Sequence, residues 1–188
     1  LDSLTNQACY DLYCDYMRQF LSYSRTIAHM RDLTAVDHIY DIFEENGTAY
    51  TVSDWDEQVS LRYFIEKSGG HLEWNAARKL FMPVLSALSA LHENGIGHYG
   101  ISLDSLSIME NGKMKLGDFC IEAVRREGGR LPADLVSGCA ALEQYGQTET
   151  FHEATDVYGF TASLFYALTG TLPEKAIKRK EDARLLIP

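Results

Sequence analysis

Residues 98–105 read His98-Tyr99-Gly100-Ile101-Ser102-Leu103-Asp104-Ser105, a polar stretch between two regular patterns. Before it, apolar residues recur with helical spacing from residue 80 to residue 91, and the pattern ends near Asn94-Gly95, a helix stop signal. After it, the apolar runs 106–109 and 114–116 flank Asn111-Gly112, a typical hairpin turn. The stretch is therefore predicted to be a loop that joins a helix to a β-hairpin.

The same stretch has the frame of the protein-kinase catalytic loop, H-R-D-x-x-x-x-N. In that frame Gly100 takes the position of the catalytic Asp, and Ser105 takes that of the Asn that holds a Mg²⁺ ion. Three later segments resemble further kinase landmarks and follow in the same order as in kinases. Lys115–Cys120 resembles the strand that leads into the D-F-G motif, and Ala141–Tyr145 resembles the A-P-E motif. Thr155–Pro173 resembles the long central helix of the large lobe and its exit.

The chain is thus similar to bacterial Ser/Thr protein kinases from about residue 20 to its end. The resemblance implies an α+β, protein kinase-like fold, with part of a small lobe in residues 1–55 and part of a mainly helical large lobe in residues 56–188. The first three strands of the small lobe are not evident, and the large lobe stops before its last helices. The chain is expected to be part of a longer protein.

Local patterns support the small lobe. Apolar residues with helical spacing between residues 8 and 30 predict a long helix, and the runs 39–43 and 49–52 around Asn46-Gly47 predict a hairpin. The resemblance makes the helix αC, with Tyr23 in place of the Glu that pairs with the ATP-binding Lys. No Gly-rich phosphate loop is present, and the first lysine is Lys67.

The resemblance also implies the ligand-binding positions. Asp118 matches the D-F-G Asp and is the only candidate metal ligand. Leu61 and Ser107 match the residues that sandwich adenine, and Trp55 lies in the hinge. Since the base, the second metal ligand and the αC Glu are replaced, no catalytic residue and no cofactor are expected. Weak ATP and Mg²⁺ binding at Asp118, Trp55 and Leu61 stays an alternative.

Other polar residues are expected to have structural roles. His98 is predicted to be a packed core residue, Asp104 to face solvent or cap a helix, and Asp156 to anchor the apolar column that joins kinase lobes. Arg125 and Arg126, in the activation-loop equivalent, are predicted to form a solvated face. Pro83 predicts a kink or break in its helix.

Composition narrows the possible partners. The net charge is −10, from 17 basic and 27 acidic residues, which disfavours nucleic acid as a ligand. The four cysteines contain no C-x-x-C pair, so reduced thiols in a cytoplasmic domain are expected. No segment approaches the ~20 apolar residues of a membrane span, so no membrane contact is expected within the chain, although segments outside it could tether it to a membrane.

The sequence thus predicts a bacterial pseudokinase domain that is not an enzyme. It is expected to act as a protein-interaction or signalling scaffold whose partner is a protein such as an active kinase. The alternative is a divergent kinase, or a nucleotide-binding regulator with weak Mg-ATP binding.

Overall fold

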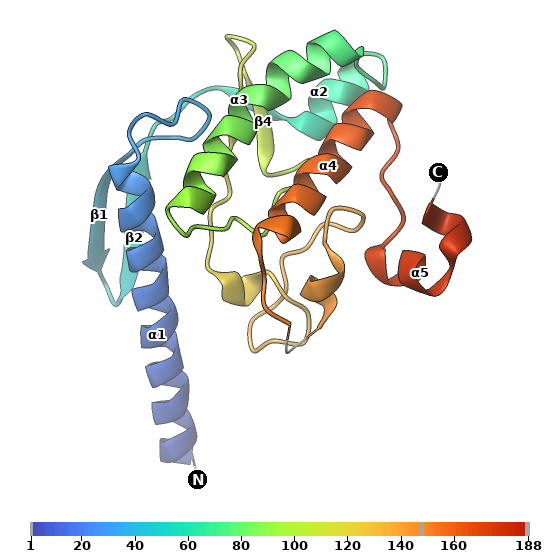
Figure 1. Ribbon diagram of the computed structural model, residues 1–188. Coiled ribbons are helices and arrows are strands. Elements are labelled where there is room, and N and C mark those ends of the chain that lie inside the picture. The colour runs from blue at the N-terminus through green and yellow to red at the C-terminus, as the bar shows by residue number, and fades with distance from the viewer. Residues whose placement is uncertain (1, 147–148, 187–188) are drawn as a thin grey trace. The chain divides into compact units, whose positions relative to one another are not determined.

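The computed structural model describes residues 2–146 and 149–186 (Figure 1). The chain divides into two compact units. The first comprises residues 1–32 and 38–55, and the second comprises residues 33–37 and 56–188.

The first unit is a long helix with one β-hairpin. Helix α1 spans Asp2–His29, and strands β1 (Ile39–Glu45) and β2 (Thr48–Ser53) pair antiparallel. Asn46 and Gly47 both have positive φ angles, as the predicted Asn-Gly turn requires. The hairpin lies beside the C-terminal half of α1 (Figure 1), where Leu21 and Ile27 are buried. The predicted long helix and hairpin are confirmed.

The second unit contains a three-stranded antiparallel sheet in the order β3-β4-β5. The strands are β3 (Gln58–Ser60), β4 (Leu106–Met109) and β5 (Met114–Leu116). The turn between β4 and β5 contains Gly112 with a φ angle of 74°. This confirms the hairpin predicted from Asn111-Gly112.

The described part of this unit also contains the helices α2 (Leu61–Lys67), α3 (Trp74–Glu93), α4 (Glu153–Thr169) and α5 (Ala176–Glu181). Short 3₁₀ turns lie at Glu122–Val124, Leu142–Tyr145 and Ala183–Leu186. Helix α3 ends at the predicted stop, with Asn94 as its cap, and it continues through Pro83 without the predicted break. Among the described residues, none of the helices has the length and apolarity needed to cross a membrane.

Helices α3 and α4 pack against each other at the centre of this unit, through an edge-to-face contact of Phe81 and Phe160 with ring centroids 5.4 Å apart. In the sequence of helix α4, apolar residues with helical spacing predict one buried face, made of Val157, Phe160, Leu164, Phe165 and Leu168. Phe160 is buried as this pattern predicts, but the pattern fails at Val157. Val157 is 48% exposed, whereas Gly159 and Ser163 are buried. The small residues allow close approach, since a Cβ atom on Gly159 would lie only 2.5 Å from the carbonyl oxygen of Ile101. Helix α4 thus packs directly against the loop of residues 98–105.

Candidate functional site

The loop of residues 98–105 is held in place by one buried carboxylate. Asp156 on helix α4 accepts hydrogen bonds from the backbone N–H groups of His98, at 2.8 Å, and Tyr99, at 2.5 Å. A third bond, of 2.9 Å, comes from Nε2 of His92 on α3. The Asp156 side chain is fully buried, so these donors supply the interactions that water would otherwise give. They also hold Tyr99 at a φ angle of 56°, which is uncommon for a non-glycine residue.

His98 is a buried core residue with a defined protonation state. Its Nε2 donates to the carbonyl oxygen of Gly117 at 2.7 Å, and its Nδ1 accepts from the N–H of Gly100 at 3.1 Å. Nδ1 therefore carries no proton, and the ring is neutral. Burial also lowers the pKa of His98, which favours the same neutral form of the ring. The ring contacts Phe119 edge to face, with centroids 4.7 Å apart.

Gly100, which the sequence predicted at the position of the kinase catalytic Asp, lies against the side chain of Arg125. A Cβ atom on Gly100 would overlap the guanidinium group of Arg125. That guanidinium group therefore takes the space that a side chain at position 100 would need. The residue type at position 100 and the position of Arg125 depend on each other.

Arg125 joins two carboxylates, an arrangement referred to below as the Arg125 bridge. Its Nη2 donates to Oδ2 of Asp118 at 3.1 Å and to the carbonyl oxygen of Asp118, and its Nη1 donates to Oδ2 of Asp134 at 2.7 Å. The arginine side chain is 1% exposed, whereas the two carboxylates are largely open to solvent. Its Nε atom is buried without a hydrogen-bond partner. The prediction that Arg125 belongs to a solvated face is wrong.

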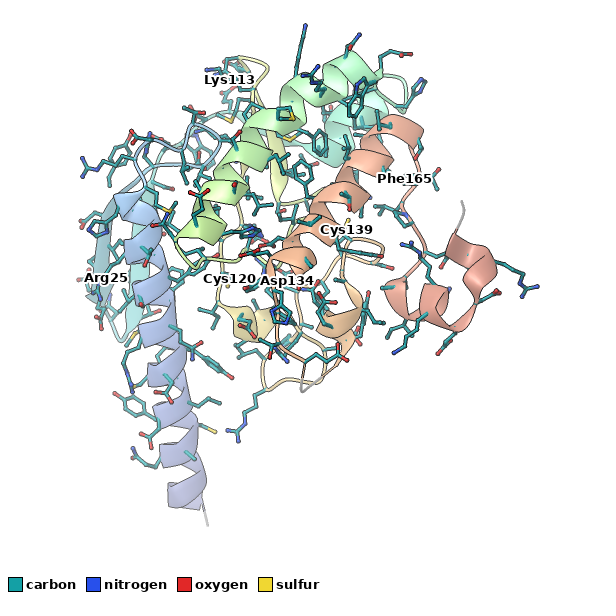
Figure 2. All side chains as sticks on the ribbon, viewed as in Figure 1. Arg25, Lys113, Cys120, Asp134, Cys139 and Phe165 are labelled. Carbon is teal, nitrogen blue, oxygen red and sulfur yellow. The ribbon has the colours of Figure 1, made fainter. Side chains whose placement is uncertain are left out.

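A small cavity of about 90 Å³ lies beside the bridge. Gly100, Asp118 and Arg125 line it together with Asp134 and Cys139, both of which are labelled in Figure 2. The structure thus brings together two predicted site positions, Gly100 and Asp118, with three residues that the sequence did not indicate as functional.

The remaining residue of the catalytic-loop frame points into its own turn. Ser105 is buried, and its hydroxyl accepts from the N–H of Ser102 at 2.9 Å and donates to the Ser102 carbonyl at 3.3 Å. Its carbonyl oxygen accepts from the N–H of Gly117, next to Asp118. Asp104 pairs with Arg62 of helix α2 at 3.3 Å, on the surface. Ser105 thus fixes the turn and presents no hydroxyl towards Asp118.

The other predicted positions are placed as follows. Leu61 is fully buried at the start of α2, and the Ser107 hydroxyl donates to the Gln58 side chain at 2.6 Å. In the first unit, Tyr23 is half-buried on α1, and Trp55 is 93% exposed. Contacts of these residues with a nucleotide stay a prediction.

Besides Asp134 and Cys139, sequence reasoning missed two buried polar residues of this site, Gln144 and Arg125. Gln144 is buried, and its Nε2 donates to the carbonyl oxygens of Tyr99, at 2.6 Å, and Arg125, at 2.9 Å. Its Oε1 accepts from the N–H of Ala141. A glutamine and an arginine are usually exposed, and no spacing in the sequence marks these two as buried.

The site as it lies does not fit the Mg-nucleotide that protein kinases use. Asp118 is already paired with a cation, and Ser105 turns away from it. Among the residues that the structure describes, no cluster of three or more His, Cys, Asp or Glu side chains could hold a metal ion. Magnesium is usually held by carboxylate oxygens together with waters and substrate phosphates, and the one candidate carboxylate is not available here.

Comparisons with known proteins identify the family. The protein kinase domain family matches residues 17–187, so the chain belongs to it. The apo form of PpkA-294, a solved structure, superposes with a TM-score of 0.73 at 28% identity, over 89% of this chain and 59% of that one. The fold is therefore the expected α+β, protein kinase-like fold.

The curated relatives are protein kinases of several kingdoms. Sperm motility kinase 3A of Mus musculus is 27% identical over 179 residues, which cover 88% of this chain and 35% of that protein. A probable serine/threonine-protein kinase of Clostridium perfringens is 25% identical over 162 residues, covering 85% of this chain and 23% of that protein. The chain thus spans about a third or less of the length of these two relatives.

These similarities correct one expectation. The sequence was predicted to encode a domain that is not an enzyme, but the match to the protein kinase domain and the serine/threonine kinase relatives point to an enzyme. The prediction relied on residue types at single positions, whereas the match covers residues 17–187.

Proposed function

We propose that this chain is the core of a divergent serine/threonine protein kinase that transfers the terminal phosphoryl group of ATP to a protein hydroxyl. The observation that carries the proposal is the support of the loop of residues 98–105 by Asp156, His98 and Gln144. Eight hydrogen bonds link these three side chains to their surroundings, and all three are buried. Phosphoryl transfer depends mainly on positioning and charge stabilisation, and a rigid loop serves that purpose.

The divergence lies in the side chains that this loop presents. Because Gly100 has no carboxylate, the loop cannot accept the proton of a substrate hydroxyl at that position. A positioned base contributes roughly 10²–10⁴ to a rate. We therefore expect a turnover well below that of a typical kinase, and weak binding of nucleotide.

The test is a transfer assay with γ-labelled ATP, Mg²⁺ or Mn²⁺, and a Ser/Thr-rich acceptor protein. The proposal expects label on the acceptor, reduced at least about tenfold by Asp118→Ala, a change of at least ~1.4 kcal/mol in the barrier. Glu174→Gln is the matched control because Glu174 pairs with Lys178 on the surface at 3.3 Å, outside the candidate site. Label no higher than in the Asp118→Ala protein would overturn the proposal.

Weak nucleotide binding has its own measurement. A ligand present at about 100 times its Kd stabilises the folded state by ~2.7 kcal/mol, so ATP at several millimolar should raise the melting temperature if Kd lies in the upper micromolar range. The absence of any shift at millimolar ATP would argue against both a kinase and a nucleotide-binding regulator.

A second candidate role is binding of a protein partner, such as an active kinase, through this domain. The observation that favours it is the Arg125 bridge, whose guanidinium group fills the space beside Gly100 and pairs with Asp118 and Asp134. With a net charge of −10, the chain would suit a basic partner surface. Biolayer interferometry against purified Ser/Thr kinase domains of the same organism tests this. The role expects association rates that fall with added salt, and no binding to any member would count against it.

A further inference from the structure

The strongest unexplained feature of the molecule is the buried cation beside Gly100. Arg125 is 1% exposed, lies between the carboxylates of Asp118 and Asp134, and has an unpaired Nε atom. Burying a charged side chain is costly unless its pairing is good. An arginine that only linked two surface carboxylates could do so while remaining exposed. Its burial in the space next to residue 100 therefore calls for a specific explanation.

The position of the positive charge of Arg125 explains its burial. Arg125 Nη2 lies 3.1 Å from Oδ2 of Asp118, the one carboxylate that the kinase frame assigns to a metal ion. A divalent cation on the same oxygen would meet a positive group at short range, where charge repulsion is large. Mg²⁺ and Mn²⁺ also need carboxylate oxygens with free lone pairs. Arg125 therefore holds the oxygen that a metal would need.

We propose that Arg125 and a divalent cation compete for Asp118, so that the Arg125 bridge is an internal block of the metal position. Gly100 makes the block possible because any larger side chain there overlaps the guanidinium group. A metal ion can bind only after the side chain of Arg125 leaves Asp118. The backbone carbonyl of Arg125 stays bonded to Gln144 during this movement. The inference rests on the proposed function only in assigning the metal to Asp118.

A Mn²⁺ titration followed by electron paramagnetic resonance tests this without measuring activity. Arg125→Gln removes the competing charge and keeps side-chain donors, so Mn²⁺ should bind at least about tenfold more tightly than to the unaltered chain, a difference of ~1.4 kcal/mol. Arg130→Gln is the matched control because it changes the net charge equally at an exposed position of the same segment. It should change the Mn²⁺ affinity by less than about threefold, as expected of an exposed, screened charge.

Two further variants separate the inference from simple loss of structure. Gly100→Ala retains Arg125 but displaces its guanidinium group, and it should also tighten Mn²⁺ binding. Adding Asp118→Asn to Arg125→Gln should abolish the gain. Circular dichroism and thermal unfolding identify the folded variants, and Gly100→Ala decides the matter if Arg125→Gln does not fold.

The inference is overturned if the folded Arg125→Gln or Gly100→Ala protein binds Mn²⁺ no more tightly than the unaltered chain. It is equally overturned if the gain survives Asp118→Asn. A negative transfer assay together with tighter Mn²⁺ binding in these variants would instead overturn the proposed kinase activity and leave the competition standing.

Discussion

Replacing Asp156 by Asn should strongly destabilise the second unit, because this one carboxylate supports the loop of residues 98–105. It accepts three hydrogen bonds, from His98 N–H, Tyr99 N–H and His92 Nε2, and its side chain is fully buried. An Asn side chain offers one acceptor oxygen and turns an NH₂ group towards donors. At least one buried N–H group then loses its partner, and the remaining bonds lose their charge.

The magnitude follows from these losses. An unsatisfied buried donor costs about 1–3 kcal/mol, and a hydrogen bond to a charged group contributes about 1.5–3 kcal/mol. We expect Asp156→Asn to lower the free energy of unfolding by about 3–5 kcal/mol, which corresponds to a decrease in Tm of roughly 6–20 °C for a protein of this size. Urea denaturation followed by circular dichroism, together with differential scanning calorimetry, measures both quantities.

The control is Glu153→Gln, which removes a charge from the exposed first turn of the same helix. Loss of its interaction with the helix dipole should cost no more than about 1 kcal/mol. If Asp156→Asn costs as little as the control, Asp156 does not support the loop and the account of the site given above is incorrect.

Three more predictions concern the same loop. Burial lowers the pKa of His98, so the unfolded chain binds up to one more proton than the folded chain as the pH falls through about 6.5. The free energy of unfolding should therefore fall as the pH drops from 7 to 5.5, by at most ~1.4 kcal/mol per pH unit, and urea titrations of His98→Gln should show a shallower pH dependence. Gly159→Ala should lower the free energy of unfolding by about 1–3 kcal/mol, because the new Cβ atom would lie 2.5 Å from the Ile101 carbonyl oxygen. Gly129→Ala is the control: its Cβ atom would have no contact closer than 3.6 Å, so thermal unfolding should be nearly unchanged. Gly100→Asp should change the transfer of label from ATP by less than about tenfold, because the Arg125 guanidinium group would pair with the new carboxylate. A gain near the ~10²-fold contribution of a positioned base would contradict this prediction.

Much of the fold follows from local patterns in the sequence. Asn46-Gly47 and Asn111-Gly112 mark hairpins, and Asn94-Gly95 marks the end of α3. These signals work because they depend on backbone angles that only a few residue types adopt readily. The buried face of α4 was predicted less well. The contact of α4 with the loop of residues 98–105 requires a small residue at Gly159. Apolar spacing alone therefore gave too much weight to Val157, which is exposed.

The candidate site, like the fold, was predicted from the sequence only in part. From the sequence alone, the order and spacing of the kinase-like motifs predicted that Gly100, Ser105 and Asp118 lie at kinase site positions. The sequence could not show that Arg125 lies against Gly100 and binds Asp118, since the arginine lies 25 positions after the glycine and a charged residue is normally exposed. Only the tertiary structure decided that, because the burial and pairing of a charge depend on which segments the fold brings together.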